Sequence, residues 1–245
     1  MVPTSGTRTA RQARPAPAAD LQAYLASALT GLDAERRAEV FALSDVVAEV
    51  CRAAGIDLYE PRQRTDPVHH HHIPDGEVFR LDRRRVTRAD LLIYLAHQPS
   101  TGSGQELVIA RGALVPIVVV AYEDAKVSRM VTGLPGTVLV RHRDLPSLTE
   151  RLAEQLEALR PLLVRRRAEF AEHTRDTFGE RLRRLRQARG LTHEDLAAAM
   201  RVPGLISATE LADWETGSDL ESDLHLVQLR ELAAALDVPL ADLLD

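Results

Sequence analysis

Two carboxylates and a short glycine-containing segment are the residues of this sequence most suited to chemistry. The segment runs from Pro99 to Glu106, with Gly102 and Gly104 in a Gly-x-Gly arrangement, and it follows an apolar run at residues 91–96. Glycines at such a turn let a ligand approach the backbone, and the N-terminus of a following helix favours an anion. Because a carboxylate there would repel a phosphate, Glu106 must serve another purpose. It either caps the helix or acts on a sugar carbon as a nucleophile or base.

A second carboxylate, Asp82, stands eight positions before Asp90 in the preceding helical segment. Two carboxylates that flank a glycosidic bond suit an oxocarbenium-like transition state. Ser100 and Ser103 add hydroxyl donors close to the glycines. By itself the Gly-x-Gly pair is a weak signal, since the segment has neither a P-loop lysine nor a longer glycine fingerprint.

Together these residues resemble the nucleoside 2-deoxyribosyltransferase superfamily, and its 2′-deoxynucleoside 5′-phosphate N-hydrolase branch most closely. The resemblance covers about residues 21–142. The matching pieces are Tyr24, Asp82-x7-Asp90, Pro99-Ser-x-Gly-x-Gly-x-Glu106, Pro116-Ile-Val and Ser128-x-Met130-x-x-Gly133.

The resemblance implies a nucleoside or nucleotide ligand and assigns roles to three side chains. Glu106 would attack the anomeric carbon and form a glycosyl-enzyme intermediate. Asp82 would handle the proton of the leaving base, and Tyr24 would orient the nucleophile. The residues that it implies at the substrate are Ser100, Gly102, Gly104, Ser128 and Asp90.

The resemblance also bears on the 5′ end of the ligand and on assembly. Ser100 would hold the 5′ phosphate or hydroxyl, and Ser128 would reach the ligand of a neighbouring subunit, which implies a homodimer. Residues 26–31 lack the glycine-rich phosphate loop of the hydrolase branch, so the need for a 5′-phosphate stays open. Ser27 or Thr30 could substitute for that loop.

A run of four histidines, His69–His72, lies in a polar loop. Such a run can bind divalent metals, but a dedicated site needs converging, spaced ligands. We favour a polar loop over the mouth of the site, and we expect no metal and no cofactor. For Arg83–Arg85, beside Asp82, we favour a solvated helix face.

Alternating strands and helices must position these residues. The unbroken apolar runs Leu91–Ala96 and Pro116–Tyr122 are typical of strands buried on both faces of a parallel sheet. The pattern predicts an α/β domain with a flavodoxin-like, doubly wound parallel sheet of about five strands. The other expected strands are 21–29, 56–59 and 137–140; the expected helices are 34–54, 77–87, 106–114 and 127–131.

A further helix is expected to begin at the capping box Ser147-x-x-Glu150. Its apolar stripe packs either on the sheet of this domain or against a second copy, and Pro161 should break or kink the helix. The stripe consists of Leu148, Leu152, Leu156, Leu159 and Leu163.

The C-terminal part resembles the Xre/λ-repressor helix-turn-helix family. The matching residues are Phe178–Ala197, with Thr192 as an N-cap, then Trp214-Glu-Thr-Gly217 and the closing helices in Leu229–Leu244. The resemblance implies an all-α helix-turn-helix bundle and DNA as a partner. The residues expected at DNA are Thr192, Ser207, Thr209, Arg181 and Arg184, with Arg183, Arg186 and Arg189 as further phosphate contacts.

The charges of this part depart from the family. His193 replaces the usual glutamine, and residues 204–214 contain Glu210 and Asp213 but no Arg or Lys. DNA phosphates would repel that face, so a protein-interaction module is the alternative.

The chain of 245 residues thus divides into four predicted parts. These are a disordered tail (1–20), the α/β domain (21–143), a helical linker (144–177) and the helix-turn-helix domain (178–245). One cysteine excludes a disulfide within the chain, and no apolar run approaches the ~20 residues of a membrane helix. We therefore expect a cytoplasmic protein without membrane association.

Two functions are compatible with these features. The first is a DNA-binding transcriptional regulator whose α/β domain binds, and could hydrolyse, a deoxynucleoside or nucleotide. The second is an N-glycosidase or deoxyribosyltransferase that acts on deoxynucleotides, with the helical domain used for assembly or protein recruitment.

Overall fold

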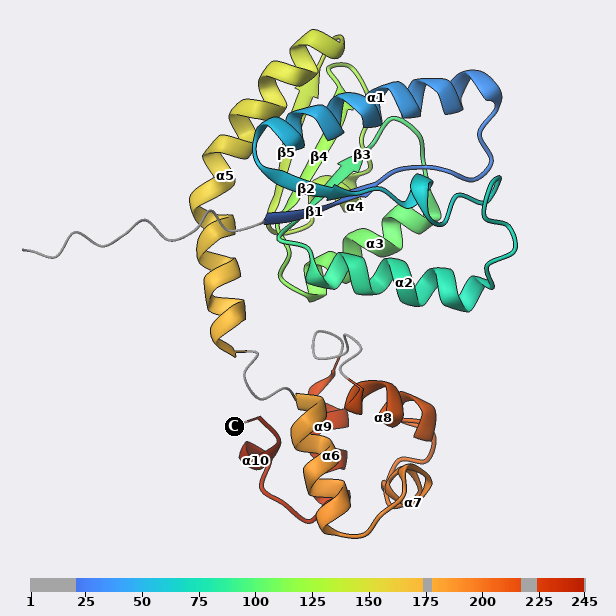
Figure 1. The fold of residues 1–245 in the computed structure, drawn as a ribbon, viewed down its shortest axis with the longest axis vertical. Coiled ribbons are helices and arrows are strands. Elements are labelled where there is room, and N and C mark those ends of the chain that lie inside the picture. The colour runs from blue at the N-terminus through green and yellow to red at the C-terminus, as the bar shows by residue number, and fades with distance from the viewer. Residues whose placement is uncertain (1–20, 174–177, 217–223, 245) are drawn as a thin grey trace, which may run out of the picture.

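The computed structural model describes residues 21–173, 178–216 and 224–244 (Figure 1). The tail predicted for residues 1–20 lies outside these residues. Five strands form one sheet in the order β2-β1-β3-β4-β5, and each neighbouring pair is parallel. This is the flavodoxin-like strand order, so the predicted fold class is confirmed. The strands are β1 (Leu21–Ala26), β2 (Ile56–Tyr59), β3 (Leu91–Leu95), β4 (Ile117–Tyr122) and β5 (Thr137–His142).

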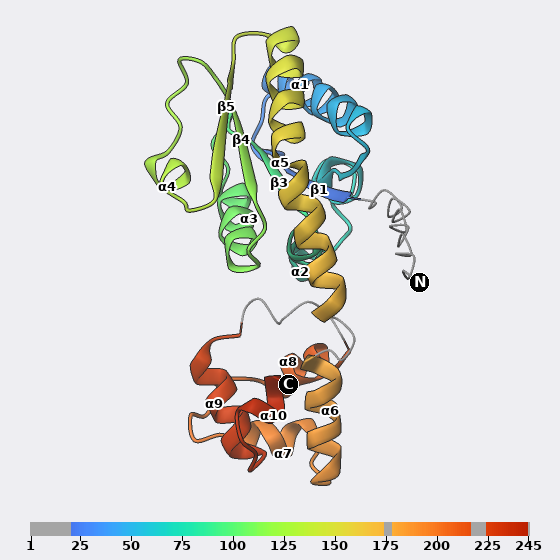
Figure 2. The same ribbon diagram turned by 90° about the vertical axis from the view of Figure 1, so that its left-hand side faces the viewer.

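Helices cover both faces of this sheet (Figure 2). On one face α1 (Ala34–Ala53) and α5 (Leu145–His173) pack over one buried apolar cluster. On the other face α2 (Asp75–Arg88) and α3 (Thr101–Gly112) pack over a second cluster. Two short helical segments complete this part, namely η1 (Pro61–Gln63) and α4 (Arg129–Thr132).

Strand β1 decides which side chains reach each face. Successive side chains of a strand point to opposite faces, so Ala23 and Leu25 belong to the cluster under α1 and α5. Tyr24 and Ala26 belong to the cluster under α2 and α3. The tyrosine therefore points to the face on which Asp82 and Glu106 lie.

Helix α3 begins earlier than its sequence predicts. Ser100 is its N-cap, and the Ser100 hydroxyl accepts a hydrogen bond from the Ser103 backbone N–H at 3.2 Å. Gly102 and Gly104 therefore lie in the first turn of the helix and not in a loop. The helix expected to begin at Glu106 therefore begins at Thr101, and the sequence prediction overlooked this cap.

Helix α5 corrects two expectations. Asp144 and not Ser147 caps it, since Asp144 Oδ1 accepts from the Ser147 N–H at 2.8 Å and Ser147 Oγ accepts from the Asp144 N–H at 3.1 Å. The helix also continues through Pro161 without a break. Its leucine stripe packs on the sheet of its own chain, with Leu148, Leu152, Leu156 and Leu163 buried there and Leu159 partly buried, so the stripe is not a dimer seam.

The C-terminal helices have an apolar core of their own, as predicted. They are α6 (Phe178–Ala188), α7 (His193–Ala198), α8 (Ala208–Glu215), α9 (Leu226–Ala235) and α10 (Ala241–Leu244). Gly179 lets α6 lie directly on α8, because a Cβ at this position would come within 2.0 Å of the Trp214 carbonyl oxygen. Of the helices that the structure describes, none is long and apolar enough to cross a membrane.

Candidate functional site

Tyr24 and Glu106 form the centre of the candidate site. The Tyr24 hydroxyl donates a hydrogen bond to Glu106 Oε1 at 2.7 Å. The tyrosine ring is fully buried and stacks on the ring of Tyr59, with 5.6 Å between the centroids. Burial raises the pKa of Tyr24 well above its ordinary value, and Glu106 and Asp82 raise it further. The hydroxyl therefore keeps its proton and remains a donor to the carboxylate.

Glu106 lies in the second turn of α3 and is nearly surrounded by protein. Burial raises its pKa to about 7; the hydrogen bond from Tyr24 lowers the pKa, and Asp82 raises it. Its second oxygen, Oε2, is buried and has no hydrogen-bond partner among the described residues. At neutral pH a large fraction of this side chain is thus an ionised carboxylate with one oxygen available to a ligand.

Asp82 faces the same space from α2. Burial raises its pKa to about 6, whereas hydrogen bonding from Thr65 and Tyr59 lowers it. Thr65 Oγ1 lies 3.4 Å from Asp82 Oδ2, and Oδ1 is buried without a partner within the described ranges. Buried polar atoms in proteins are generally hydrogen-bonded. Two unpartnered carboxylate oxygens in one place therefore indicate a ligand site.

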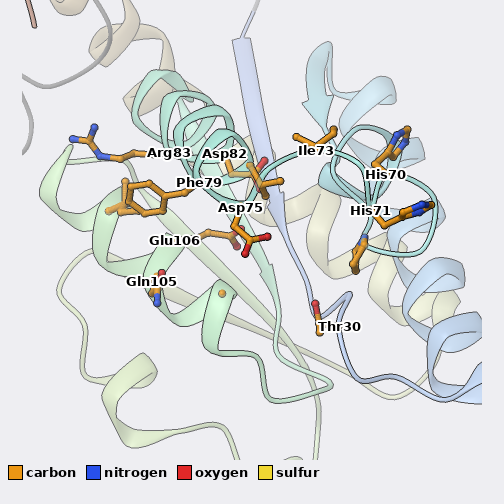
Figure 3. Close-up of a pocket in the computed structure, with 14 residues that line it drawn as sticks. Thr30, His70, His71, Ile73, Asp75, Phe79, Asp82, Arg83, Gln105 and Glu106 are labelled. Carbon is orange, nitrogen blue, oxygen red and sulfur yellow. The ribbon is translucent and has the colours of Figure 1, made fainter. Parts of the chain in front are cut away.

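A pocket of about 490 Å³ opens at the two carboxylates (Figure 3). This volume is within the usual range for small-molecule sites, roughly 300–1,000 Å³. The pocket lies at the carboxyl ends of the parallel strands, where doubly wound sheets bind ligands. Its lining consists of Thr30, Pro67, His70, His71, Ile73, Asp75, Val78, Phe79, Asp82, Arg83, Gly102, Gln105, Glu106 and Ile109.

The histidine-containing loop forms one wall of this pocket. His70 and His71 line it, while His69 and His72 are exposed elsewhere on the loop. Asp66 holds the base of the loop through an ion pair with Arg37 and a 2.9 Å hydrogen bond from the Val68 N–H. In the part of the chain that the structure describes, no group of three or more His, Cys, Asp or Glu side chains could hold a metal ion.

The other residues expected at the substrate occupy different positions. Gly102 lines the pocket. Ser100 caps α3, one residue before that helix begins, and Gly104 lies in its first turn. Ser128 is exposed and caps α4, with the Met130 N–H 3.3 Å from its hydroxyl oxygen.

Asp90 is a correction to the expected substrate contacts. It precedes β3 and so lies at the amino end of the sheet, away from the pocket. Its Oδ2 accepts from the Gln22 N–H at 2.8 Å and from Arg167 Nη1 at 3.0 Å. A buried carboxylate that is satisfied in this way joins β1 and α5 at the amino end of β3 and is not available to a ligand.

Several pocket residues were not identified from the sequence. Phe79 and Gln105 lie beside Asp82 and Glu106, and the signal that could have found Phe79 is its position one helical turn before Asp82. Arg83, for which a solvated helix face was expected, also lines the pocket. The Arg85 guanidinium lies over the ring of Tyr59, 4.8 Å from its centroid.

In the C-terminal helices, Glu215 joins three basic side chains. Arg186 donates to its two carboxylate oxygens at 2.6 Å each, through Nε and Nη2. His193 Nε2 lies 3.1 Å from Glu215 Oε2, and Arg183 donates to the Glu215 carbonyl oxygen. The unusual histidine at position 193 therefore contacts the internal ion pair.

The expected DNA contacts divide into two groups. Thr192 and Ser207 are exposed N-caps of α7 and α8, and Thr209 is exposed in the first turn of α8. Arg184 is also exposed, but Arg181 is half-buried and donates through Nε to the Leu243 carbonyl oxygen at 3.1 Å.

The remaining arginines of α6 and its end also have partners inside this bundle. Arg183 and Arg186 are held by Glu215, and Arg189 Nη2 donates to the Asp237 carbonyl oxygen at 2.7 Å. Their contact with DNA phosphates therefore stays a prediction. Their first role is to hold the helices together.

Comparison with solved structures found several chains of similar fold. A CMP N-glycosidase, BcmB, from Clostridium botulinum shares 14% identity, with 54% of this chain and 96% of that chain covered and a TM-score of 0.42. A 2-deoxyribosyltransferase from Bacillus psychrosaccharolyticus shares 18% identity over 52% and 90% of the two chains, also at 0.42. A conserved protein from Enterococcus faecalis V583 shares 16% identity over 56% and 99%, at 0.40.

Sequence comparisons concern the other end of the chain. Among curated proteins, none matched the chain in sequence. One family model matches, over residues 177–245. Its description is that of a helix-turn-helix domain, so the C-terminal part of the chain, with its α6–α10 bundle, has the sequence and the helical structure of this class of domain.

Proposed function

We propose that the α/β part of this chain cleaves or transfers the N-glycosidic bond of a nucleoside or nucleotide. The observation that carries the proposal is that Glu106, which accepts a hydrogen bond from Tyr24, and Asp82 line the same pocket. The resemblance of residues 21–142 to the deoxyribosyltransferase superfamily supports it. The free oxygens of Glu106 and Asp82 support it as well.

Glu106 acts as the nucleophile in this proposal. With Tyr24 bound to Oε1, Oε2 attacks the anomeric carbon; the bond from that carbon to the base nitrogen breaks, and a glycosyl ester forms. Protonated Asp82 gives its proton to the departing base. Water, or a second base, then attacks the anomeric carbon, the ester breaks, and the incoming group returns a proton to Asp82.

Both carboxyl groups titrate near neutral pH, and because Glu106 has the higher pKa, the productive form is the minor one of the two singly protonated forms. The productive form has Glu106 ionised and Asp82 protonated, and the two pKa values are about 7 and about 6. The pair therefore titrates as a unit, and kcat/KM should follow a bell between pH 6 and 7. Ser100 and Gly102 at the start of α3 are proposed to meet the 5′ end of the ligand.

Release of free base tests the proposal. The purified chain is incubated with deoxynucleoside 5′-monophosphates and with the matching deoxynucleosides, and the products are separated by chromatography. We expect free base from at least one substrate. If calorimetry shows that these ligands bind and yet no base is released from any of them, the enzymatic proposal is wrong.

A second proposed function is DNA binding by residues 178–245, as in a regulator that senses a nucleotide. The match to a helix-turn-helix domain favours it, and α8 exposes Ser207 and Thr209 at its N-terminus. Such domains usually bind DNA as dimers, and we propose that this chain forms a homodimer. Binding to the DNA upstream of the gene is measured at several salt concentrations. Affinity should fall as salt rises, and a flat response contradicts DNA binding.

A further inference from the structure

We infer that the base of the ligand stacks on Phe79, in a slot between α2 and α3, and that the pocket thereby binds a nucleoside or nucleotide in one orientation. The inference rests on the proposed function, because it takes Glu106 and Asp82 as the groups that act at the glycosidic bond. It adds the residues that hold the base.

Phe79 is an exposed aromatic side chain on the wall of the pocket. It is 53% exposed, and it lines the pocket from α2. Phe41, by comparison, lies under the guanidinium groups of Arg37 and Arg62, and Phe178 packs against Trp214. No such ring or cation contact covers Phe79 within the described residues. A flat apolar ligand could cover this ring and remove its surface from water.

The position of Asp82 places the base on this side. Phe79 and Asp82 are three residues apart on α2, so their side chains share one face of the helix. If Asp82 gives a proton to the leaving base, that base must lie against this face. Phe79 lies one helical turn from Asp82, so its ring can stack on the flat face of the base.

Helix α3 supplies the opposite wall of the slot. Gln105 and Ile109 are four residues apart, and both line the pocket. Ile109 offers an apolar contact to the second face of the base, and the Gln105 amide can donate and accept hydrogen bonds at its edge. Because an amide can do both, Gln105 fits several bases and does not by itself select one.

The two ends of the pocket differ in character. Figure 3 shows Phe79, Arg83 and Gln105 on one side of Glu106, and Thr30, His70 and His71 on the other. We place the base on the side that carries the exposed ring of Phe79, and the sugar with its 5′ end on the side of Thr30, His70 and His71. The anomeric carbon then falls between them, at Glu106.

Calorimetric titration tests this placement with two ligands that differ only in the base. The ligands are a deoxynucleoside 5′-monophosphate and 2-deoxyribose 5-phosphate, and the proteins are wild type, Phe79→Leu, Phe79→Trp and the control Val108→Ala. Val108 is exposed on α3 and does not line the pocket. We expect Phe79→Leu to weaken the nucleotide by about 5- to 150-fold, the range typical of lost base stacking, and to leave the sugar phosphate unchanged. Phe79→Trp and Val108→Ala should bind the nucleotide as wild type does.

Two results overturn the placement. One is an unchanged nucleotide affinity in Phe79→Leu; the other is an equal loss for both ligands, which a structural role of Phe79 would give. Base release by the wild type separates this inference from the proposed function. If the wild type releases base and Phe79→Leu binds the nucleotide as tightly as the wild type, the proposed function is supported and the placement of the base is contradicted. If Phe79→Leu selectively loses nucleotide affinity but the wild type releases no base, the placement of the base is supported and the proposed catalytic function is contradicted.

Discussion

Glu106 is a half-buried glutamate in the α/β part, Glu215 is a buried glutamate in the helical bundle, and their surroundings are opposite. Burial tends to raise the pKa of Glu215, but hydrogen bonds from Arg186 and His193 bring it below its ordinary value. Glu106 is held by the neutral hydroxyl of Tyr24, and burial raises its pKa to about 7. A carboxylate that is matched by cations stabilises a fold, whereas one left with a free oxygen and a raised pKa is suited to a ligand.

The largest effect expected from this contrast is on stability in the helical bundle. Glu215→Gln leaves the Arg186 guanidinium buried without its ion-pair partner, so we expect the bundle to lose about 3–5 kcal/mol of unfolding free energy. Denaturant titration followed by the fluorescence of Trp214 measures this loss. Base release should not change. Unaltered bundle stability would mean that the ion pair contributes nothing.

The opposite effect is expected for Glu106→Gln. Because the folded protein holds Glu106 at a raised pKa, its contribution to stability is present below the unfolded pKa of about 4.3 and is lost as pH rises through 7. The variant lacks this titration. It should therefore exceed the wild type by about 2–3 kcal/mol at pH 8 and by much less at pH 4. Thermal unfolding at both pH values measures the difference, and an equal difference at the two would contradict it.

Tyr24→Phe tests the hydrogen bond at the centre of the site. Its loss removes a bond to a charged group, for which we expect base release to slow by about 10- to 150-fold. It also raises the pKa of Glu106, so a smaller fraction of the protein has Glu106 ionised while Asp82 is protonated. The alkaline limb of the kcat/KM profile should move to higher pH. A uniformly slower profile with unmoved limbs would count against a direct link to Glu106.

The smallest effect is expected at Asp90. Asp90→Asn weakens the contacts to Gln22 and Arg167, so we expect a loss of about 1–2 kcal/mol in unfolding free energy. Base release per folded molecule should stay within about twofold of wild type. A large loss of activity at unchanged stability would restore Asp90 as a substrate residue.

The sequence predicted the sheet well, because the strands depend on local pattern. Unbroken apolar runs mark β3 and β4, and the strand order places the end of β1 next to the start of α3. The position of Tyr24 beside Glu106 came from a family resemblance, and strand alternation explains it.

The starts of α3 and α5 were misplaced because their capping residues were overlooked, whereas the other errors concern contacts between residues that are distant in the chain. Asp90 meets Arg167, which is 77 positions away, and Arg186 meets Glu215 across 29 positions. A single sequence shows the charges of these residues but not which of them pair. Phe79 was overlooked for a related reason, since its exposure matters only once α2 and α3 lie side by side at the pocket.

Release of free base by wild type and by Glu106→Gln, measured side by side, tests the central claim most directly. Both proteins are first shown by calorimetry to bind the same deoxynucleotide, so that loss of activity cannot reflect loss of the ligand. Wild type should release base, and the variant should be slower by on the order of 10³-fold or more, as for the loss of a nucleophile. Equal release by the two proteins, or none by wild type despite binding, would contradict the assignment of Glu106 as the nucleophile.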